Sequence, residues 1–149
     1  MVAHSFPDVA RQRDVYARVL DEAKGRPVTF RTLDVGSDKH LPYLRMPPED
    51  NPAMGWRAIR MVLDRPTLLR GQLRALLKAA AGRHLLIMFP MVAEVAELIA
   101  ARRLLDMELE RAVAVGAELP GRIEVGTMVE VPSLFWQMRA LLPRVDFVS

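Results

Sequence analysis

Alternating strand-like and helix-like segments are the feature that most constrains the fold of this chain. Three short apolar runs, beginning at Val28, Leu85 and Arg122, have the β-branched and aromatic residues typical of strands, and VDFVS at residues 145–149 begins a fourth. A helix-like segment precedes each of them. Because strands separated by helices pair in parallel through right-handed crossovers, we expect an α/β fold.

The helix-like segments carry their own start and stop signals. The first is expected to be capped by Ser5 and ended by Gly25, and the second to be capped by Asp64 and ended by Gly82. The third runs from about residue 92 to 115, and a shorter helix lies within residues 132–143. The apolar faces predicted for the first two helices are Val15, Tyr16, Val19 and Leu20, and Leu69, Leu73, Leu76, Leu77 and Ala80.

Four strands and four helices fit about half of a (β/α)₈ TIM barrel, since a complete barrel takes roughly 250 residues. We therefore interpret residues 1–149 as one incomplete barrel domain, part of a longer protein. Four parallel strands without their neighbours would leave open sheet edges. A homo-oligomer is the expected consequence.

Composition excludes several classes of function. Lysine and arginine exceed aspartate and glutamate by only 3, an excess too small to indicate nucleic-acid binding. Without cysteine the chain has neither a disulfide nor a thiolate metal site. Its longest aliphatic run, HLLIMFPMV, is too short to cross a bilayer, and its amino terminus lacks an apolar signal segment. We expect a cytoplasmic protein with no membrane partner.

Charged residues follow two of the expected strands. Arg31 and Asp34 stand where the strand from Val28 ends, and Glu130 stands where the strand from Arg122 ends. A proline-rich connection from Asp34 to Trp56 leads to Arg57, and long connections of this kind are usually functional or mobile. Structural explanations stay open: a strand arginine commonly pairs with a nearby carboxylate, and Arg57 could begin a basic helix.

Three ordered segments resemble one known family. VTFRTLDVGSDKHLPYL, NPAMGWRAIR with LLIMFPMV after it, and IEVGTMVEVP followed by VDFVS are similar to successive blocks of the phosphoenolpyruvate (PEP)-binding domain of enzyme I of the bacterial phosphotransferase system, including its nitrogen-related paralogue. The order and spacing match from about Phe30 to Ser149. Pyruvate phosphate dikinase and PEP synthase share parts of these motifs, but the DVGSDK form looks closer to enzyme I.

The resemblance implies a barrel whose strand exits hold PEP and Mg²⁺. Arg31 and Arg57 match family arginines that bind PEP, and a guanidinium suits phosphate and carboxylate because it donates paired hydrogen bonds. Glu130 matches the magnesium-binding glutamate. The phosphoryl group would pass to a histidine on another domain and then to a phosphocarrier protein, as in sugar transport.

The family pattern also includes groups that this chain lacks. They are an arginine on an earlier strand, an asparagine–aspartate pair that completes the Mg²⁺ site, a further arginine and a cysteine. We therefore expect the 149 residues alone to be inactive. The alternatives are a dikinase-type or synthase-type barrel, and a regulatory or interaction module that has lost its chemistry.

The other charged and aromatic residues receive structural interpretations. Asp34, Asp38 and Lys39 have a supporting role that a salt-bridged turn would explain as well as ligand contact. Arg70, Arg74 and Lys78 are expected on a solvated helix face. Trp56 and Trp136 are assigned to packing, and none of His4, His40 and His84 is nominated as catalytic.

Overall fold

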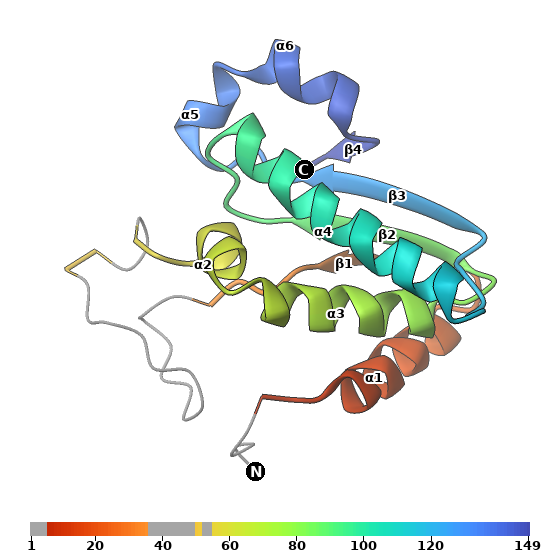
Figure 1. The fold of residues 1–149 in the computed structure, drawn as a ribbon. Coiled ribbons are helices and arrows are strands. Elements are labelled where there is room, and N and C mark those ends of the chain that lie inside the picture. The colour runs from red at the N-terminus through yellow and green to blue at the C-terminus, as the bar shows by residue number, and fades with distance from the viewer. Residues whose placement is uncertain (1–5, 36–49, 52–54) are drawn as a thin grey trace.

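A single parallel sheet organises the fold. The computed structural model describes residues 6–35, 50–51 and 55–149. Strands β1 (Thr29–Arg31), β2 (His84–Phe89), β3 (Arg122–Thr127) and β4 (Phe147–Val148) lie in sequence order, and every neighbouring pair is parallel (Figure 1). The expected α/β fold with four parallel strands is confirmed.

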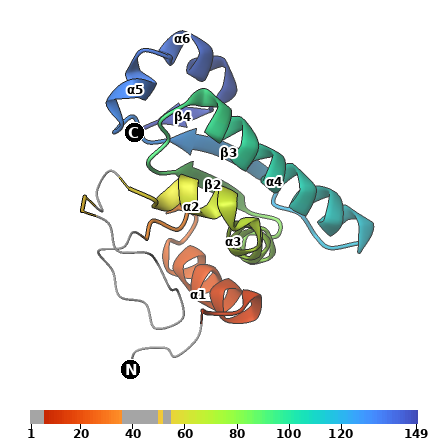
Figure 2. The ribbon, with the colours of Figure 1, turned by 60° about the vertical axis from the view of Figure 1, so that its left-hand side comes forward.

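Helices fill each connection between the strands. Helix α1 (Val9–Glu22) precedes β1, and α2 (Ala58–Asp64) and α3 (Pro66–Ala79) lead to β2. Helix α4 (Val95–Ala114) joins β2 to β3, and α5 (Pro132–Phe135), α6 (Met138–Leu141) and the 3₁₀ helix η1 (Leu142–Arg144) lead to β4. Figures 1 and 2 show α2, α3 and α4 side by side against the sheet, with α1 packed along α3. Within the described residues, no helix is long and apolar enough to cross a membrane.

The two faces of the sheet are covered to different degrees. Leu85, Ile87 and Phe89 alternate along β2 and are fully buried against the helices. The residues between them, Leu86 and Met88, are only half-buried. Since side chains alternate across a strand, one face is sealed by helices and the other is partly open.

Helix α1 turns a different face inward from the one expected. Asp8, not Ser5, is the N-cap, and its carboxylate accepts a hydrogen bond from the Arg11 N–H. Val15 and Val19 are exposed, while Leu20 is buried. Together with Gln12 and Tyr16, Leu20 forms the row that faces the protein. Val15 and Val19 were therefore wrongly placed on the inward face of α1, because an apolar pattern does not reveal a buried glutamine such as Gln12.

The other helix boundaries needed two corrections, and the assignment of one tryptophan needed a third. Asp64 ends α2 rather than capping α3, whose N-cap is Arg65, and Asp64 accepts a hydrogen bond from Trp56 Nε1 instead. The single helix expected in residues 132–143 is broken into α5, α6 and η1. Trp136 is 85% exposed, so its assignment to packing was wrong. The predicted terminator Gly82 has a left-handed backbone, with φ of 68°, beyond the end of α3.

The basic row on α3 is not a solvated face. Arg70 Nε donates to Glu108 Oε1 at 2.6 Å, and Arg74 donates to both Glu108 oxygens at 2.7 and 3.0 Å. The Glu108 side chain on α4 is fully buried, whereas Lys78 is exposed. Burial alone would raise the pKa of Glu108, but the hydrogen bonds and charges of Arg74 and Arg70 outweigh it and lower that pKa. Two arginines thus join α3 to α4 through one buried carboxylate.

A glycine on β3 makes room for an aromatic ring on β4. Gly126 pairs with Phe147, and a Cβ atom added at Gly126 would lie 2.4 Å from the Phe147 ring. Any side chain at position 126 would therefore overlap the Phe147 ring.

Candidate functional site

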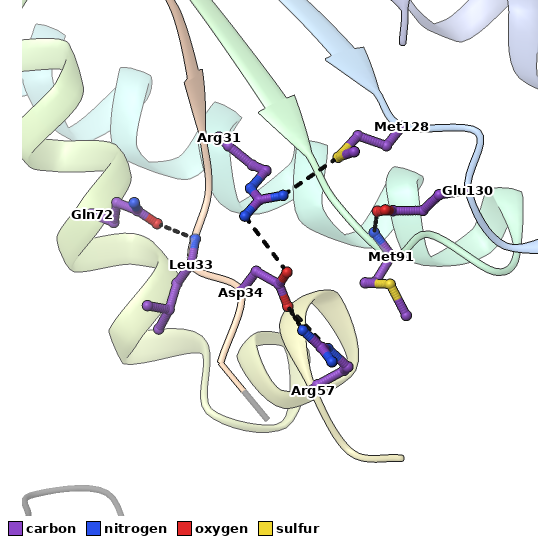
Figure 3. Close-up of polar contacts among 8 residues, drawn as sticks. All are labelled: Arg31, Leu33, Asp34, Arg57, Gln72, Met91, Met128 and Glu130. Atoms are coloured by element: carbon purple, nitrogen blue, oxygen red, sulfur yellow. Dashed lines mark hydrogen bonds and ion pairs between the residues drawn. The ribbon is translucent and has the colours of Figure 1, made fainter. Parts of the chain in front are cut away.

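The residues expected to bind a ligand lie at the same edge of the sheet. Arg31 is the last residue of β1, Arg57 is the N-cap of α2, and Glu130 lies three residues after the end of β3. Arg31 pairs in register with Met88, which pairs with Gly126, so the three strands end at the same level. Figure 3 shows Arg31 and Arg57 on either side of Asp34, with Glu130 beside the loop that follows β2.

Asp34 joins the two arginines. Arg57 Nε and Nη2 both donate to Asp34 Oδ1, at 3.1 and 2.9 Å. Arg31 Nη2 lies 3.8 Å from Asp34 Oδ2. The side chains of Arg57 and Asp34 are 15% and 11% exposed, while that of Arg31 is 48% exposed. Arg57 is therefore held firmly beside β1, whereas Arg31 is half-exposed and makes a longer contact with Asp34.

A main-chain contact also brings Arg57 to β1. The N–H of Ala58, the residue after Arg57, donates to the Val35 carbonyl at 3.4 Å. Ala58 has a left-handed backbone, with φ of 47°, and both Ala58 and Val35 are buried. Positive φ is costly for a residue with a side chain and is found where the surroundings impose it. The start of α2 is thus anchored beside Asp34.

Glu130 is held by the loop after β2. Its Oε1 accepts a 2.7 Å hydrogen bond from the Met91 N–H, and Met91 too has a left-handed backbone, with φ of 58°. The remaining oxygen of this exposed carboxylate has no hydrogen bond from the described residues. Glu130 fits a metal ion as one oxygen ligand.

The described residues do not supply a complete metal site. Across residues 6–35, 50–51 and 55–149, no three histidine, cysteine, aspartate or glutamate side chains come close enough to hold a metal ion. Mg²⁺ usually keeps one or two carboxylates together with waters and substrate oxygens. Glu130 would therefore be a partial ligand, completed by groups outside this set.

Of the remaining residues singled out in the sequence, His84 can be placed and four others cannot. Asp38, Lys39, His4 and His40 lie outside the described residues. His84 begins β2 at the opposite end of the strands, 3.6 Å from Glu124.

Trp56 is partly buried and packs near the site as expected. Its ring lies 4.9 Å from the Arg65 guanidinium.

Sequence reasoning missed Gln72 and Met128. Gln72 Oε1 accepts the Leu33 N–H at 2.9 Å, and Met128 Sδ lies 3.9 Å from Arg31 Nη1 (Figure 3). A lone amide among the leucines of α3 was the available signal for Gln72. Nothing in the sequence singles out Met128.

The arrangement can bind an anion. Two guanidinium groups share one aspartate at a strand exit, where parallel α/β proteins commonly bind ligands. A profile of one protein family, the PEP-binding domain of PEP-utilising enzymes, matches residues 1–149. The chain belongs to this family.

Three proteins similar to this chain have names that refer to phosphoryl transfer. The chain is 46% identical over 144 residues to "Phosphoenolpyruvate-protein phosphotransferase" of Bacillus subtilis (strain 168), an alignment that covers 97% of the chain and 25% of that protein. It is 46% identical over 143 residues to "Multiphosphoryl transfer protein" of Rhodobacter capsulatus, covering 96% and 17%. The match in Latilactobacillus sakei, also a "Phosphoenolpyruvate-protein phosphotransferase", is 43% identical and covers 100% and 26%. The chain spans about a quarter or less of these relatives.

Proposed function

We propose that this chain is the part of a PEP-dependent phosphotransferase that binds PEP, and that it forms about half of a (β/α)₈ barrel. The observation that carries the proposal is the Arg31–Asp34–Arg57 cluster beside Glu130 at the carboxyl edge of one parallel sheet. The names of the relatives favour a phosphotransferase over a dikinase-type or synthase-type barrel. A sheet with one sealed and one half-open face supports the half-barrel, since in a barrel the second face is buried by the remaining strands.

The two arginines would share the work of holding PEP. Arg57 is fixed by Asp34 and supplies a preset positive charge, which costs little reorganisation when an anion arrives. Arg31 is more exposed and would turn its guanidinium onto the phosphate or the carboxylate. Both groups are suited to stabilise charge on the phosphate and on the enolate that leaves it.

Glu130 would supply one oxygen to Mg²⁺, together with groups outside the described residues. When bound, the ion would neutralise charge on the phosphate oxygens. The phosphoryl acceptor would be a histidine on another domain of the complete protein, followed by a phosphocarrier protein. On this proposal the 149 residues alone bind PEP weakly and transfer nothing.

Binding and transfer can be measured separately in the full-length gene product. Calorimetric titration with PEP and Mg²⁺ should give an affinity that falls about 10-fold or more in Arg57→Ala and Arg31→Ala, since one charge-assisted hydrogen bond contributes about 1.5–3 kcal/mol. Glu130→Gln should weaken the Mg²⁺ dependence. Arg122→Ala is the control, because Arg122 begins β3 at the other end of the sheet.

The possible results separate the candidate functions. Formation of phosphohistidine from PEP supports the phosphotransferase. Tight PEP binding without transfer indicates the regulatory module, and a requirement for ATP indicates the dikinase type. PEP binding that survives both arginine substitutions would contradict the assignment of this site.

A further inference from the structure

A buried amide on α3 contacts the end of β1. Gln72 is 8% exposed and lies between the leucines of α3, where an unpartnered amide would be costly. Its Oε1 accepts the Leu33 N–H at 2.9 Å, and its Nε2 donates to the Tyr16 hydroxyl at 3.1 Å. Figure 3 shows this amide directed at Leu33, on the side of β1 away from Glu130.

Main-chain pairing between β1 and β2 ends just before Leu33. The Thr32 N–H still donates to the Met88 carbonyl of β2, at 3.0 Å. The next N–H, that of Leu33, points to the opposite side of the strand, away from β2, and donates to Gln72. Asp34, which joins the two site arginines, is the following residue. The Gln72 side chain therefore joins the main chain of the residue just before Asp34 to α3, on the side of β1 that no described strand covers.

Tyr16 fixes which end of the Gln72 amide faces Leu33. Its hydroxyl accepts from Gln72 Nε2 and donates to Gln12 Oε1 at 3.4 Å. Burial raises the pKa of Tyr16 more than the Gln72 hydrogen bond lowers it, so the hydroxyl keeps its proton at neutral pH. The Tyr16 ring also packs edge-to-face on Phe30 of β1, with the ring centroids 5.2 Å apart. Because the hydroxyl takes the amide N–H₂, the amide oxygen remains for Leu33.

We propose that Gln72, oriented by Tyr16, is a positioning residue for the anion site: it fixes the main chain at Leu33 and thereby sets Asp34 between Arg31 and Arg57. Gln72 touches neither arginine. Its effect is transmitted through one main-chain hydrogen bond and one residue of chain. The effect of Gln72 on PEP binding rests on the function proposed above. Its effect on the Asp34–Arg57 geometry does not.

Gln72→Met is the informative substitution, because methionine has a similar shape and removes the amide. Gln12→Met is the matched control, since Gln12 is equally buried at 8% but contacts Pro7 and Tyr16 rather than β1. Gln72→Glu is the conservative variant, because a carboxylate can still accept from the Leu33 N–H, and the Tyr16 hydroxyl can turn its one proton from Gln12 to this carboxylate. Tyr16→Phe keeps the Gln72 acceptor and removes only its orienting partner, so it serves if Gln72→Met does not fold.

Two NMR signals report on the geometry in the full-length gene product. In Gln72→Met, the Leu33 amide should exchange about 10-fold faster or more, since its hydrogen bond is lost. The Arg57 Nε–H signal, sharp when bound to Asp34, should broaden. Gln12→Met should leave both signals unchanged, Gln72→Glu should restore them, and Tyr16→Phe should fall between. Equal changes in Gln12→Met, or no change in Gln72→Met, would overturn the inference.

The PEP titration then separates this inference from the proposed function. The dissociation constant for PEP should rise about 10-fold in Gln72→Met, because small displacements of binding groups are costly. If the unaltered protein binds PEP and Gln72→Met binds it equally well, Gln72 does not position the site. If the unaltered protein does not bind PEP, the proposed function fails, and the two NMR signals still decide whether Gln72 sets the Asp34–Arg57 pair.

Discussion

Replacing the buried Glu108 by glutamine tests the charge cluster between α3 and α4. Three hydrogen bonds from Arg70 and Arg74 end on this carboxylate. A glutamine keeps one acceptor oxygen and has no charge, so about one bond is lost and the others weaken from ion-paired bonds to bonds between a charged arginine and a neutral oxygen. Hydrogen bonds to charged groups contribute about 1.5–3 kcal/mol and neutral ones about 1 kcal/mol.

These values give a loss of roughly 2–3 kcal/mol in the free energy of unfolding, once the partial exposure of the arginines is considered. The Arg70 and Arg74 side chains are 31% and 27% exposed, so water recovers part of their interaction. Urea unfolding followed by far-UV circular dichroism measures this difference. The urea midpoint should fall by about 1–2 M, given the usual dependence on denaturant.

The pH dependence has a definite sign. The folded protein holds the pKa of Glu108 below its ordinary value of 4.5, so the stabilisation is fully present above that pH. It is lost as the pH falls through the lowered pKa, because the native carboxylate must then take up a proton. The difference in urea midpoint between Glu108→Gln and the unaltered protein should be constant from pH 7 to about 5. It should narrow in stronger acid.

Glu110→Gln provides the control, since Glu110 is an exposed carboxylate on the same helix. Its effect should stay within about 0.5 kcal/mol. Equal midpoints for Glu108→Gln and the unaltered protein at pH 7, or a difference that does not narrow as the pH falls below 4.5, would refute the reasoning.

Three further substitutions and one association measurement test the remaining packing. Gly126→Ala should destabilise by about 1–3 kcal/mol in urea unfolding, since its Cβ would meet the Phe147 ring; no loss would mean that the ring moves freely. Leu76→Ala should cost about 2–5 kcal/mol, because Leu76 is fully buried, and a smaller cost would argue against this core. Trp136→Ala should change the melting temperature little, whereas a large drop would show that the exposed ring packs. Sedimentation velocity should show concentration-dependent self-association, since the sheet has an open face and edges; a sharp-melting monomer would contradict this.

The elements of the fold were largely predictable because their signals are local. Apolar runs marked β2 and β3, and the predicted helix ends at Gly25 and Gly82 both have positive φ. The charged residues at the strand exits followed from the same reasoning, because parallel strands end at one edge. The local signals were less accurate for the helix starts, since the caps expected at Ser5 and Asp64 were wrong.

Other errors concern partners far away along the chain. Arg70 and Arg74 resembled a solvated face because their partner, Glu108, lies 38 and 34 residues away on another helix. Gln72 contacts Leu33 across 39 residues, and no helical period reveals such a pair. The alternative that Arg57 begins a helix is confirmed, but the left-handed backbone of Ala58 that anchors it has no signal in the sequence, because alanine rarely adopts it.

The space left by Gly126 decides where the shortest strand attaches. Strand β4 has only two residues, so main-chain pairing with β3 fixes its alignment weakly. A slip by one residue would move the Phe147 ring to the opposite side of the sheet and leave the hollow over Gly126 empty. The absence of a side chain at Gly126 therefore fixes the register of β4, because the backbone pairing of so short a strand does not select one alignment.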